Sequence, residues 1–341
     1  MIEEISKTAS EQRAVARSEA PVFVLGCGRS GTTLLYHMLL SAGNFAVYRT
    51  ESNVINLLEP RFGNLSVRRN KERLMDAWLD SKLFQVSGLD ANQIRDKVMA
   101  ECQNGGDFLR IVMGEMARQQ GVRRWADCTP EHLLHLPRIK ETIPEALIIH
   151  IIRDGRDVAL STDKLGYLKR APWDTKPSVM VAGLYWDWMV TRGRKEGSKL
   201  GRDYIEVHFE ELVGDPRFTL ARLSDFVEQD LDYDHIQKVG IGSVSEPNTS
   251  FAGKNGGAGF NPVGRWKHGL SGEKLIMFEA LVGRTLEDLG YSLSTTDRTL
   301  LEQPELNRMR STYRKYFDSK LYLKAKTPLG KLLVTRDLSW L

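Results

Sequence analysis

The segment FVLGCGRSGTTLLYH, residues 23–37, joins the pattern of a strand to that of a helix through a glycine-rich turn. The apolar run at residues 22–25 is short, lies between a proline and a glycine, and predicts a buried parallel strand. In TTLLYHMLLSAG the apolar side chains fall on one helical face, and the helix is expected to end at Gly43. This order of elements predicts an α/β fold in which helices flank a central parallel sheet.

The glycine-rich turn has the spacing of a phosphate-binding loop but lacks its lysine. Gly26 and Gly31 stand five residues apart, as in G-x-x-x-x-G-K-[ST], and Thr32 occupies the lysine position. Successive backbone N–H groups and the helix dipole would converge on an anion there, although a tight turn without a ligand is the alternative. The predicted anion-binding residues are Gly28, Arg29, Ser30, Gly31, Thr32 and Thr33.

The missing lysine indicates which kind of anion the loop accepts. In nucleotide-hydrolysing loops that lysine reaches the β- and γ-phosphates, and the hydroxyl after it holds magnesium. Here the cation stands earlier, at Arg29, which suits a 5′-phosphate bearing one further anionic group. A nucleotide kinase or NTPase is therefore disfavoured but stays an alternative, together with a non-catalytic anion-binding surface protein.

The composition is that of an ordinary globular protein and argues against several functions. Of 341 residues, 41% are hydrophobic and 27% charged, and the net charge of +4 is too small to indicate a nucleic-acid binder. The three cysteines lack the spacing of a zinc site or a disulfide framework, so we expect no metal and a reducing, cytoplasmic location. No apolar run approaches the roughly 18 residues that a membrane-spanning helix needs.

The RSGTT form of the loop resembles the 5′-phosphosulfate loop of sulfotransferases that use 3′-phosphoadenylyl sulfate (PAPS), in the style of their bacterial, carbohydrate and tyrosyl-protein branches. The resemblance covers residues 21–292 and ends in LEDLGY, which is typical of the family's last core helix. It implies that the protein moves a sulfuryl group from PAPS to a hydroxyl-bearing acceptor, releases 3′,5′-adenosine bisphosphate (PAP) and uses no metal. It also implies that Arg29 stabilises the bridging oxygen as sulfate leaves.

The resemblance requires a second anion site for the 3′-phosphate of the donor. The β-branched run at residues 147–152 predicts a central parallel strand, and Arg153 follows its carboxyl end, where open α/β sheets bind ligands. In the family, an arginine at such a strand end is followed eight residues later by a serine, and Arg153 and Ser161 have this spacing. A guanidinium fork and a hydroxyl suit a dianionic phosphate, whereas a surface turn with local ion pairs is the alternative.

A third segment, residues 253–271, is rich in glycine and contains GRWK, which is similar to the family's late G-x-W-K element. The resemblance implies that Arg265 or Lys267 contacts the 3′-phosphate. The segment WADCTPEH matches the family's W-x-x-K-T-P-x-H except that Cys128 stands where a lysine is common. We therefore expect Arg29, with help from Lys267 or Arg124, to supply the positive charge that stabilises the leaving group.

The resemblance also implies a base that accepts the acceptor's proton. The tyrosyl-protein branch has a glutamate after the first helix in a stretch similar to YRTESNVI, which identifies Glu51 as the first candidate and leaves His132 as the second. Insertions near 60–120 and 165–200 are expected to form a helical cap over a sugar, lipid or small natural product. Tryptophans that could stack on a sugar there, or belong to the core instead, are Trp173, Trp186 and Trp188.

The basic residues gather at the carboxyl end of the chain. Residues 305–341 hold nine Lys and Arg against three acids. With interspersed apolar residues, they predict an amphipathic helix that docks on the protein's own core, and they leave open a peripheral contact with a membrane. We divide the chain into an N-terminal tail (1–20), a sulfotransferase-like domain (21–295) and a basic C-terminal extension packed on that domain (296–341).

Overall fold

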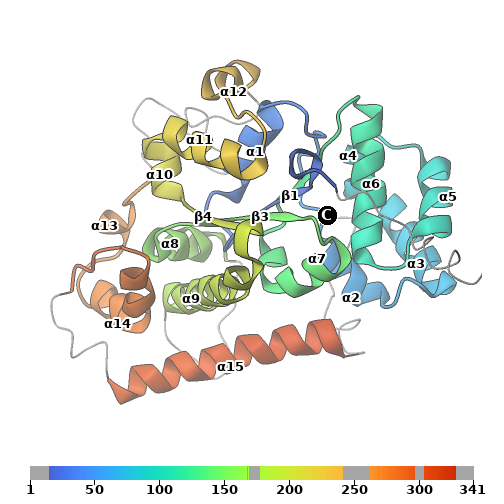
Figure 1. The fold of residues 1–341 in the computed structure, drawn as a ribbon. Helices are drawn as coiled ribbons and strands as arrows, with labels where there is room; N and C mark the ends of the chain where they lie inside the picture. Colours follow the sequence, from blue (N-terminus) through green and yellow to red (C-terminus); the bar gives the residue numbers. More distant parts are fainter. Residues whose placement is uncertain (1–14, 167, 169–176, 241–261, 296–302, 328–341) are drawn as a thin grey trace, which may run out of the picture.

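A computed structural model describes residues 15–166, 168, 177–240, 262–295 and 303–327 of the chain (Figure 1). Its sheet has four parallel strands in the order β2-β1-β3-β4. The two strands predicted from apolar runs are confirmed, and both are buried along their whole length. The strands are β1 (Val22–Leu25), β2 (Ala126–Asp127), β3 (Leu147–Ile152) and β4 (Tyr204–His208).

The upper face of the sheet in Figure 1 is covered by helices from two parts of the chain. Val22 and Val24 of β1 point to this face, and they share one apolar cluster with the helices that cover it. The helix predicted after the glycine-rich turn is present and ends two residues earlier than expected. The covering helices are α1 (Thr32–Ser41), α10 (Phe209–Gly214), α11 (Pro216–Val227) and α12 (Tyr233–Val239).

The lower face carries a second and larger apolar cluster. Phe23 and Leu25, which alternate with the valines along β1, contribute to it together with Trp186. The long helix α15 crosses below the others in Figure 1 and buries Tyr313 and Phe317 against them. The helices on this side are α8 (Gly155–Leu165), α9 (Ser178–Gly197), α14 (Glu273–Asp288) and α15 (Pro304–Lys326).

Of the two insertions expected to form a helical cap, the one near 60–120 is helical, whereas the described part of the one near 165–200 is mainly α9, which packs into the core. Three helices of the first insertion begin at side-chain N-caps, in which Ser81, Asp90 and Asn104 each accept a hydrogen bond from a backbone N–H of the first turn. A π-helical turn, η2 (Val54–Leu58), precedes this cap. The cap helices are α2 (Glu59–Phe62), α3 (Arg68–Leu79), α4 (Lys82–Ser87), α5 (Ala91–Glu101) and α6 (Gly105–Gln119).

Strand order places the ligand crevice of this sheet. The chain leaves β1 toward β2 on one side and later adds β3 and β4 on the other, so the order reverses between β1 and β3. In open α/β sheets, ligands bind at the carboxyl ends of the strands at such a switch point. The two segments there are residues 26–31 after β1 and 153–154 after β3, which are the two anion-binding elements predicted from the sequence.

The remaining elements are short. They are η1 (Arg17–Glu19), η3 (Pro130–His135), α7 (Leu136–Thr142), η4 (Ser198–Asp203) and α13 (Trp266–Gly269). In the described part of the chain, no helix combines the length and the apolar character needed to cross a bilayer.

Candidate functional site

The loop between β1 and α1 is fixed by close contacts that exclude side chains. A Cβ atom on Gly26 would lie 2.4 Å from the carbonyl oxygen of Ile151, and one on Gly31 would lie 2.3 Å from the Phe209 ring. Gly31 also has a φ of 97°, and Arg29 adopts a positive φ of 74°, which is unusual for a residue with a side chain. Because the end of β3 and Phe209 confine the loop, its backbone is preorganised at the start of α1.

Two buried polar atoms near the switch point fit an anionic ligand. Ser30 Oγ and Arg153 Nε are both buried and have no hydrogen-bond partner among the described residues. A buried donor without a partner costs about 1–3 kcal/mol, more when it is charged, so such atoms are rare unless a ligand uses them. Together with the dipole of α1, these donors supply what a phosphate or sulfate group requires.

Arg153 is held in place from several sides. Its Nη1 donates to the carbonyl of Arg29 at 3.0 Å, its Nη2 donates to the carbonyl of Pro262, and its guanidinium lies 4.6 Å from the centre of the Phe209 ring. Burial lowers the pKa of Arg153, and the nearby carboxylate of Asp157 opposes that shift. Phe209 therefore supports both the glycine-rich loop and the arginine of the second element.

Ser161 lies two turns into α8 and contacts the first loop directly. Arg29 Nε donates a hydrogen bond of 3.0 Å to Ser161 Oγ. These two residues and Arg265 line one cavity of about 530 Å³, so predicted residues from three separate segments come together. Lys267 is exposed and does not line this cavity, which makes Arg265 the better placed of the two expected cations. The cavity is lined by Arg29, Asp157, Leu160, Ser161, Asp163, Lys164, Leu165, Arg265, His268 and Gly269.

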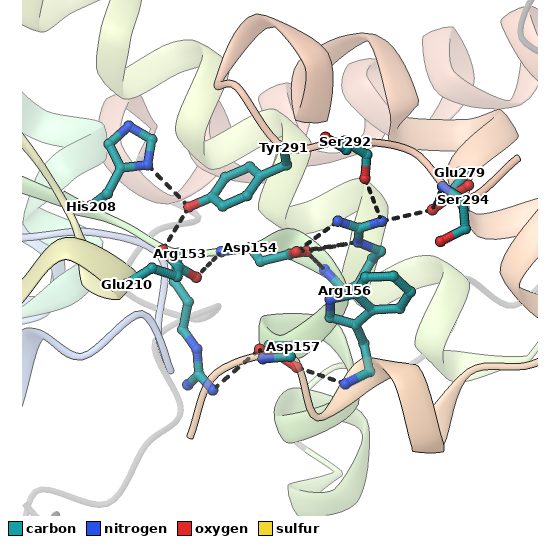
Figure 2. Close-up of polar contacts among 12 residues, drawn as sticks. Arg153, Asp154, Arg156, Asp157, His208, Glu210, Glu279, Tyr291, Ser292 and Ser294 are labelled. Atoms are coloured by element: carbon teal, nitrogen blue, oxygen red, sulfur yellow. Dashed lines mark hydrogen bonds and ion pairs between the residues drawn. The ribbon is translucent and has the colours of Figure 1, made fainter. Parts of the chain in front are cut away.

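The segment that carries Arg265 is docked on α8 by the residues that follow Arg153. Asp157 accepts hydrogen bonds from the backbone N–H groups of Gly264 and Trp266, each at 2.8 Å. The Arg156 guanidinium lies 3.7 Å from the centre of the Trp266 ring. In Figure 2 the guanidinium of Arg153 points toward Asp157, whereas that of Arg156 points toward Asp154 and Glu279.

Arg156 is itself held by two buried carboxylates. It forms a two-pronged ion pair with Asp154 and a hydrogen bond of 2.7 Å to Glu279 on α14 (Figure 2). Glu210 receives the backbone N–H of Asp154 and the hydroxyl of Tyr291. This network keeps the turn between β3 and α8 in one conformation, because every change there would leave a buried charge unpaired.

Glu51 lies at the start of an irregular segment, and the two residues after it are held in place by hydrogen bonds to Thr129. Its side chain is exposed, whereas Ser52 and Asn53 are buried. The hydroxyl of Thr129 lies 3.3 Å from Ser52 Oγ and accepts the backbone N–H of Asn53 at 3.2 Å. Asn53 has a φ of 53°, so the chain turns sharply there into η2. The backbone that presents Glu51 is thus fixed against the end of β2.

His132 is fully buried and both of its ring nitrogens are engaged. Nδ1 lies 2.8 Å from Asp127 Oδ1, and Nε2 accepts the backbone N–H of Ile55 at 3.1 Å. Because Nε2 receives a hydrogen bond, the proton of the neutral ring sits on Nδ1 and is donated to Asp127. The geometry suits a residue that orients the segment after Glu51 better than one that takes a proton from a substrate.

One expectation about an individual residue needs correction, and one alternative that the sequence left open is decided. Arg124 does not approach Arg29: its guanidinium is buried and donates to the carbonyls of Ala20, Val227 and Arg17. Trp186 and Trp188 belong to the core, where Trp186 Nε1 donates to the carbonyl of Arg153, so neither offers a face to a sugar. Trp173 and the glycine-rich part of the late segment at 253–261 lie outside the described residues.

Sequence reasoning missed Asp157 and Phe209. Asp157 stands one helical turn after Arg153, a spacing that indicates a shared face but not a partner. Phe209 follows β4, and its contact with Gly31 links segments far apart in the chain. A glycine that requires a close neighbour is a usable signal, although the neighbour cannot be named from the sequence.

Comparison with known proteins identifies related chains. A model of the sulfotransferase family matches residues 21–233. Among solved structures, the sulfotransferase domain from the Synechococcus PCC 7002 olefin synthase has a TM-score of 0.52 and 19% identity, covering 80% of this chain and 95% of that one. Sulfotransferase STF9 from Mycobacterium avium has a TM-score of 0.44 and 14% identity, covering 82% of this chain and 79% of that one. No match is found among curated proteins.

Proposed function

Because the chain belongs to the sulfotransferase family, we propose that it transfers a sulfuryl group from PAPS to a hydroxyl-bearing acceptor and releases PAP. The observation that carries this proposal is the convergence of Arg29, Ser161 and Arg265 around one cavity at the switch point of the sheet. These residues come from three segments, and an anion with two separated charged groups is the ligand that would use all three.

The residues present fit the donor. The loop at residues 26–31 and the start of α1 would hold the 5′-phosphosulfate, where Ser30 Oγ is buried and available. Ser161 and Arg265, which line the cavity, would hold the 3′-phosphate. Arg153 is not part of that lining but would assist them, since its Nε is likewise buried without a partner among the described residues. When bound, PAPS supplies an activated sulfuryl group.

Arg29 is proposed to stabilise negative charge on the leaving phosphate. It stands in the preorganised loop and carries the charge that phosphate loops usually place on lysine. A cation fixed where charge develops lowers the barrier without reorganising during the reaction. Since Cys128 replaces the family's lysine and Arg124 is engaged elsewhere, Arg29 carries this role among the cations considered for it.

Glu51 is proposed as the base that receives the acceptor's proton. Its carboxylate is exposed, and its backbone is fixed by the Ser52 and Asn53 contacts with Thr129. A positioned carboxylate can accept a proton as the acceptor oxygen attacks. His132 would act through Ile55 by holding the segment that follows, instead of contacting the substrate.

Isothermal titration of the wild-type protein with PAP and with ATP–Mg²⁺ tests the proposal. We expect PAP to bind and ATP–Mg²⁺ to bind far more weakly, because the loop lacks the lysine that reaches the β- and γ-phosphates. The opposite preference would favour a nucleotide kinase or NTPase. PAP binding without sulfate transfer to any alcohol, sugar or lipid in a labelled-donor screen would favour a non-catalytic anion-binding protein.

A further inference from the structure

Asp157 is an acidic residue in a cavity that is proposed to hold an anion. It is buried, it lines the cavity proposed to hold the donor's 3′-phosphate, and it lies 3.8 Å from Arg153. A carboxylate in an anion site repels the ligand and competes for the arginine that binds it. Its presence calls for a compensating role.

That role is visible in its two hydrogen bonds. Oδ2 accepts the N–H of Gly264 and Oδ1 accepts the N–H of Trp266, both at 2.8 Å, so one carboxylate holds the backbone on either side of Arg265. Gly264 has a φ of 73°, which few other residues would adopt. These two hydrogen bonds fix the backbone from which the Arg265 side chain reaches the cavity.

We propose that Asp157 is a positioning residue for donor binding, which places Arg265 in the donor cavity by holding the backbone of Gly264 and Trp266. This inference rests on the proposed function, because it assigns the cavity to the 3′-phosphate. The RDGRD segment then has two roles: Arg153 faces the ligand, and Asp157 assembles the second cation beside it. Donor binding at this site therefore depends on Asp157, although its carboxylate carries the same sign of charge as the ligand.

Whether Asp157→Asn weakens or tightens PAP binding distinguishes a residue that positions Arg265 from one that only repels the ligand. Asparagine keeps the size but offers one acceptor oxygen and an amide that cannot accept the second N–H. We expect PAP affinity, measured by isothermal titration, to fall about tenfold, the worth of one hydrogen bond to a charged group. Removal of a repulsive charge alone would tighten binding. Asp234→Asn is the matched control, because Asp234 is an exposed aspartate that pairs with Arg217 and lies outside the lining of this cavity, so it should leave PAP affinity unchanged.

A double-mutant cycle tests whether Asp157 acts through Arg265. In the Arg265→Ala background, Asp157→Asn should no longer weaken PAP binding, since the side chain that it positions is gone. Equal weakening in both backgrounds would overturn the proposal. If Asp157→Asn does not fold, Asp157→Glu displaces the carboxylate by one methylene and should show the same dependence on Arg265.

A ligand-free measurement separates failure of this inference from failure of the proposed function. Trypsin cleaves after Arg265 and Lys267, and mass spectrometry can follow cleavage there in the folded protein. Asp157→Asn should accelerate cleavage at these bonds at least fivefold, whereas Asp234→Asn should not, because local release of backbone contacts controls access. Unchanged cleavage would refute the proposal that Asp157 holds this backbone. If cleavage is accelerated but the wild-type protein does not bind PAP, Asp157 still holds the backbone and the assignment of the cavity to the donor is wrong.

Discussion

Arg29 Nε donates a hydrogen bond of 3.0 Å to Ser161 Oγ and so joins the loop after β1 to the helix after β3. A second hydrogen bond joins the same two segments, because the backbone carbonyl of Arg29 accepts a hydrogen bond of 3.0 Å from Arg153 Nη1. The two predicted anion-binding elements are therefore connected in the protein without a ligand. A donor that spans both would meet a preformed site, which reduces the ordering cost of binding.

Arg29→Ala should lose turnover more than donor affinity. Its charge matters most when negative charge accumulates on the leaving oxygen, so kcat and kcat/KM should fall together, on the order of a hundredfold. Steady-state kinetics with PAPS would check this once an acceptor is found. Arg217→Ala, which removes an exposed arginine paired with Asp234, is the matched control. An increase in KM alone would mean that Arg29 only anchors the donor.

Arg153→Ala should weaken PAP binding by about 2–3 kcal/mol and Ser161→Ala by about 1 kcal/mol, since the first removes a charge-assisted contact. Isothermal titration measures both. Arg153 also holds the carbonyls of Arg29 and Pro262, so Arg153→Lys is a useful companion that keeps the charge and loses the fork. Wild-type affinity in both alanine variants would remove the 3′-phosphate assignment.

Strands β1 and β3, the first loop and the spacing of Arg153 and Ser161 were predictable because each is encoded within one strand–helix unit. An apolar run of six residues at 147–152 predicts a buried strand, and the residue after it lies at the sheet edge by geometry alone. The contacts of Asp157 were not predictable in the same way. Its partners, Gly264 and Trp266, stand 107 and 109 residues further along the chain.

Arg124 illustrates the opposite failure. An arginine close in sequence to the WADCTPEH segment resembled a free cation, but it donates hydrogen bonds to three backbone carbonyls that lie about a hundred residues away in the sequence. Burial lowers the pKa of Arg124 to about 10, in keeping with a structural role. Charge can be counted from a sequence, whereas the partner that neutralises or captures it depends on the tertiary fold.

The three cysteines should be unreactive in the native protein, including Cys27 in the donor loop. Burial raises the pKa of Cys27 to about 12, with a further contribution from Glu131, and burial also raises that of Cys102 to about 12 and that of Cys128 strongly. The thiolate is the reactive form, so a raised pKa leaves almost none of it at pH 8. Titration with a chromogenic disulfide should detect all three thiols only after unfolding. Rapid native labelling of Cys27 would contradict this assignment.

Phe317→Ala should destabilise the protein without affecting the donor site. Phe317 on α15 is buried against Tyr185 and Trp188 of α9, with ring centres 5.4 and 5.3 Å apart. Truncation of a buried phenylalanine costs about 3 kcal/mol or more, which denaturant unfolding would measure. Tyr322→Ala is the control on the same helix, because Tyr322 is 63% exposed. Loss of PAP affinity in a folded Phe317→Ala protein would implicate α15 in donor binding.

Glu51→Gln should slow sulfate transfer by roughly 10²- to 10⁴-fold, the usual worth of a positioned base, and leave PAP affinity nearly unchanged. Glutamine keeps the shape of glutamate but cannot accept the proton, and kcat with an aliphatic alcohol acceptor is the measurement, because a phenol would arrive partly ionised. Glu72→Gln changes a half-exposed glutamate on α3 that pairs with Arg68, and it controls for the loss of charge. His132→Asn should lower stability more than turnover, since both ring nitrogens serve hydrogen bonds within the fold. If the histidine variant lost its rate while Glu51→Gln kept it, His132 would be the base and Glu51 an exposed loop acid.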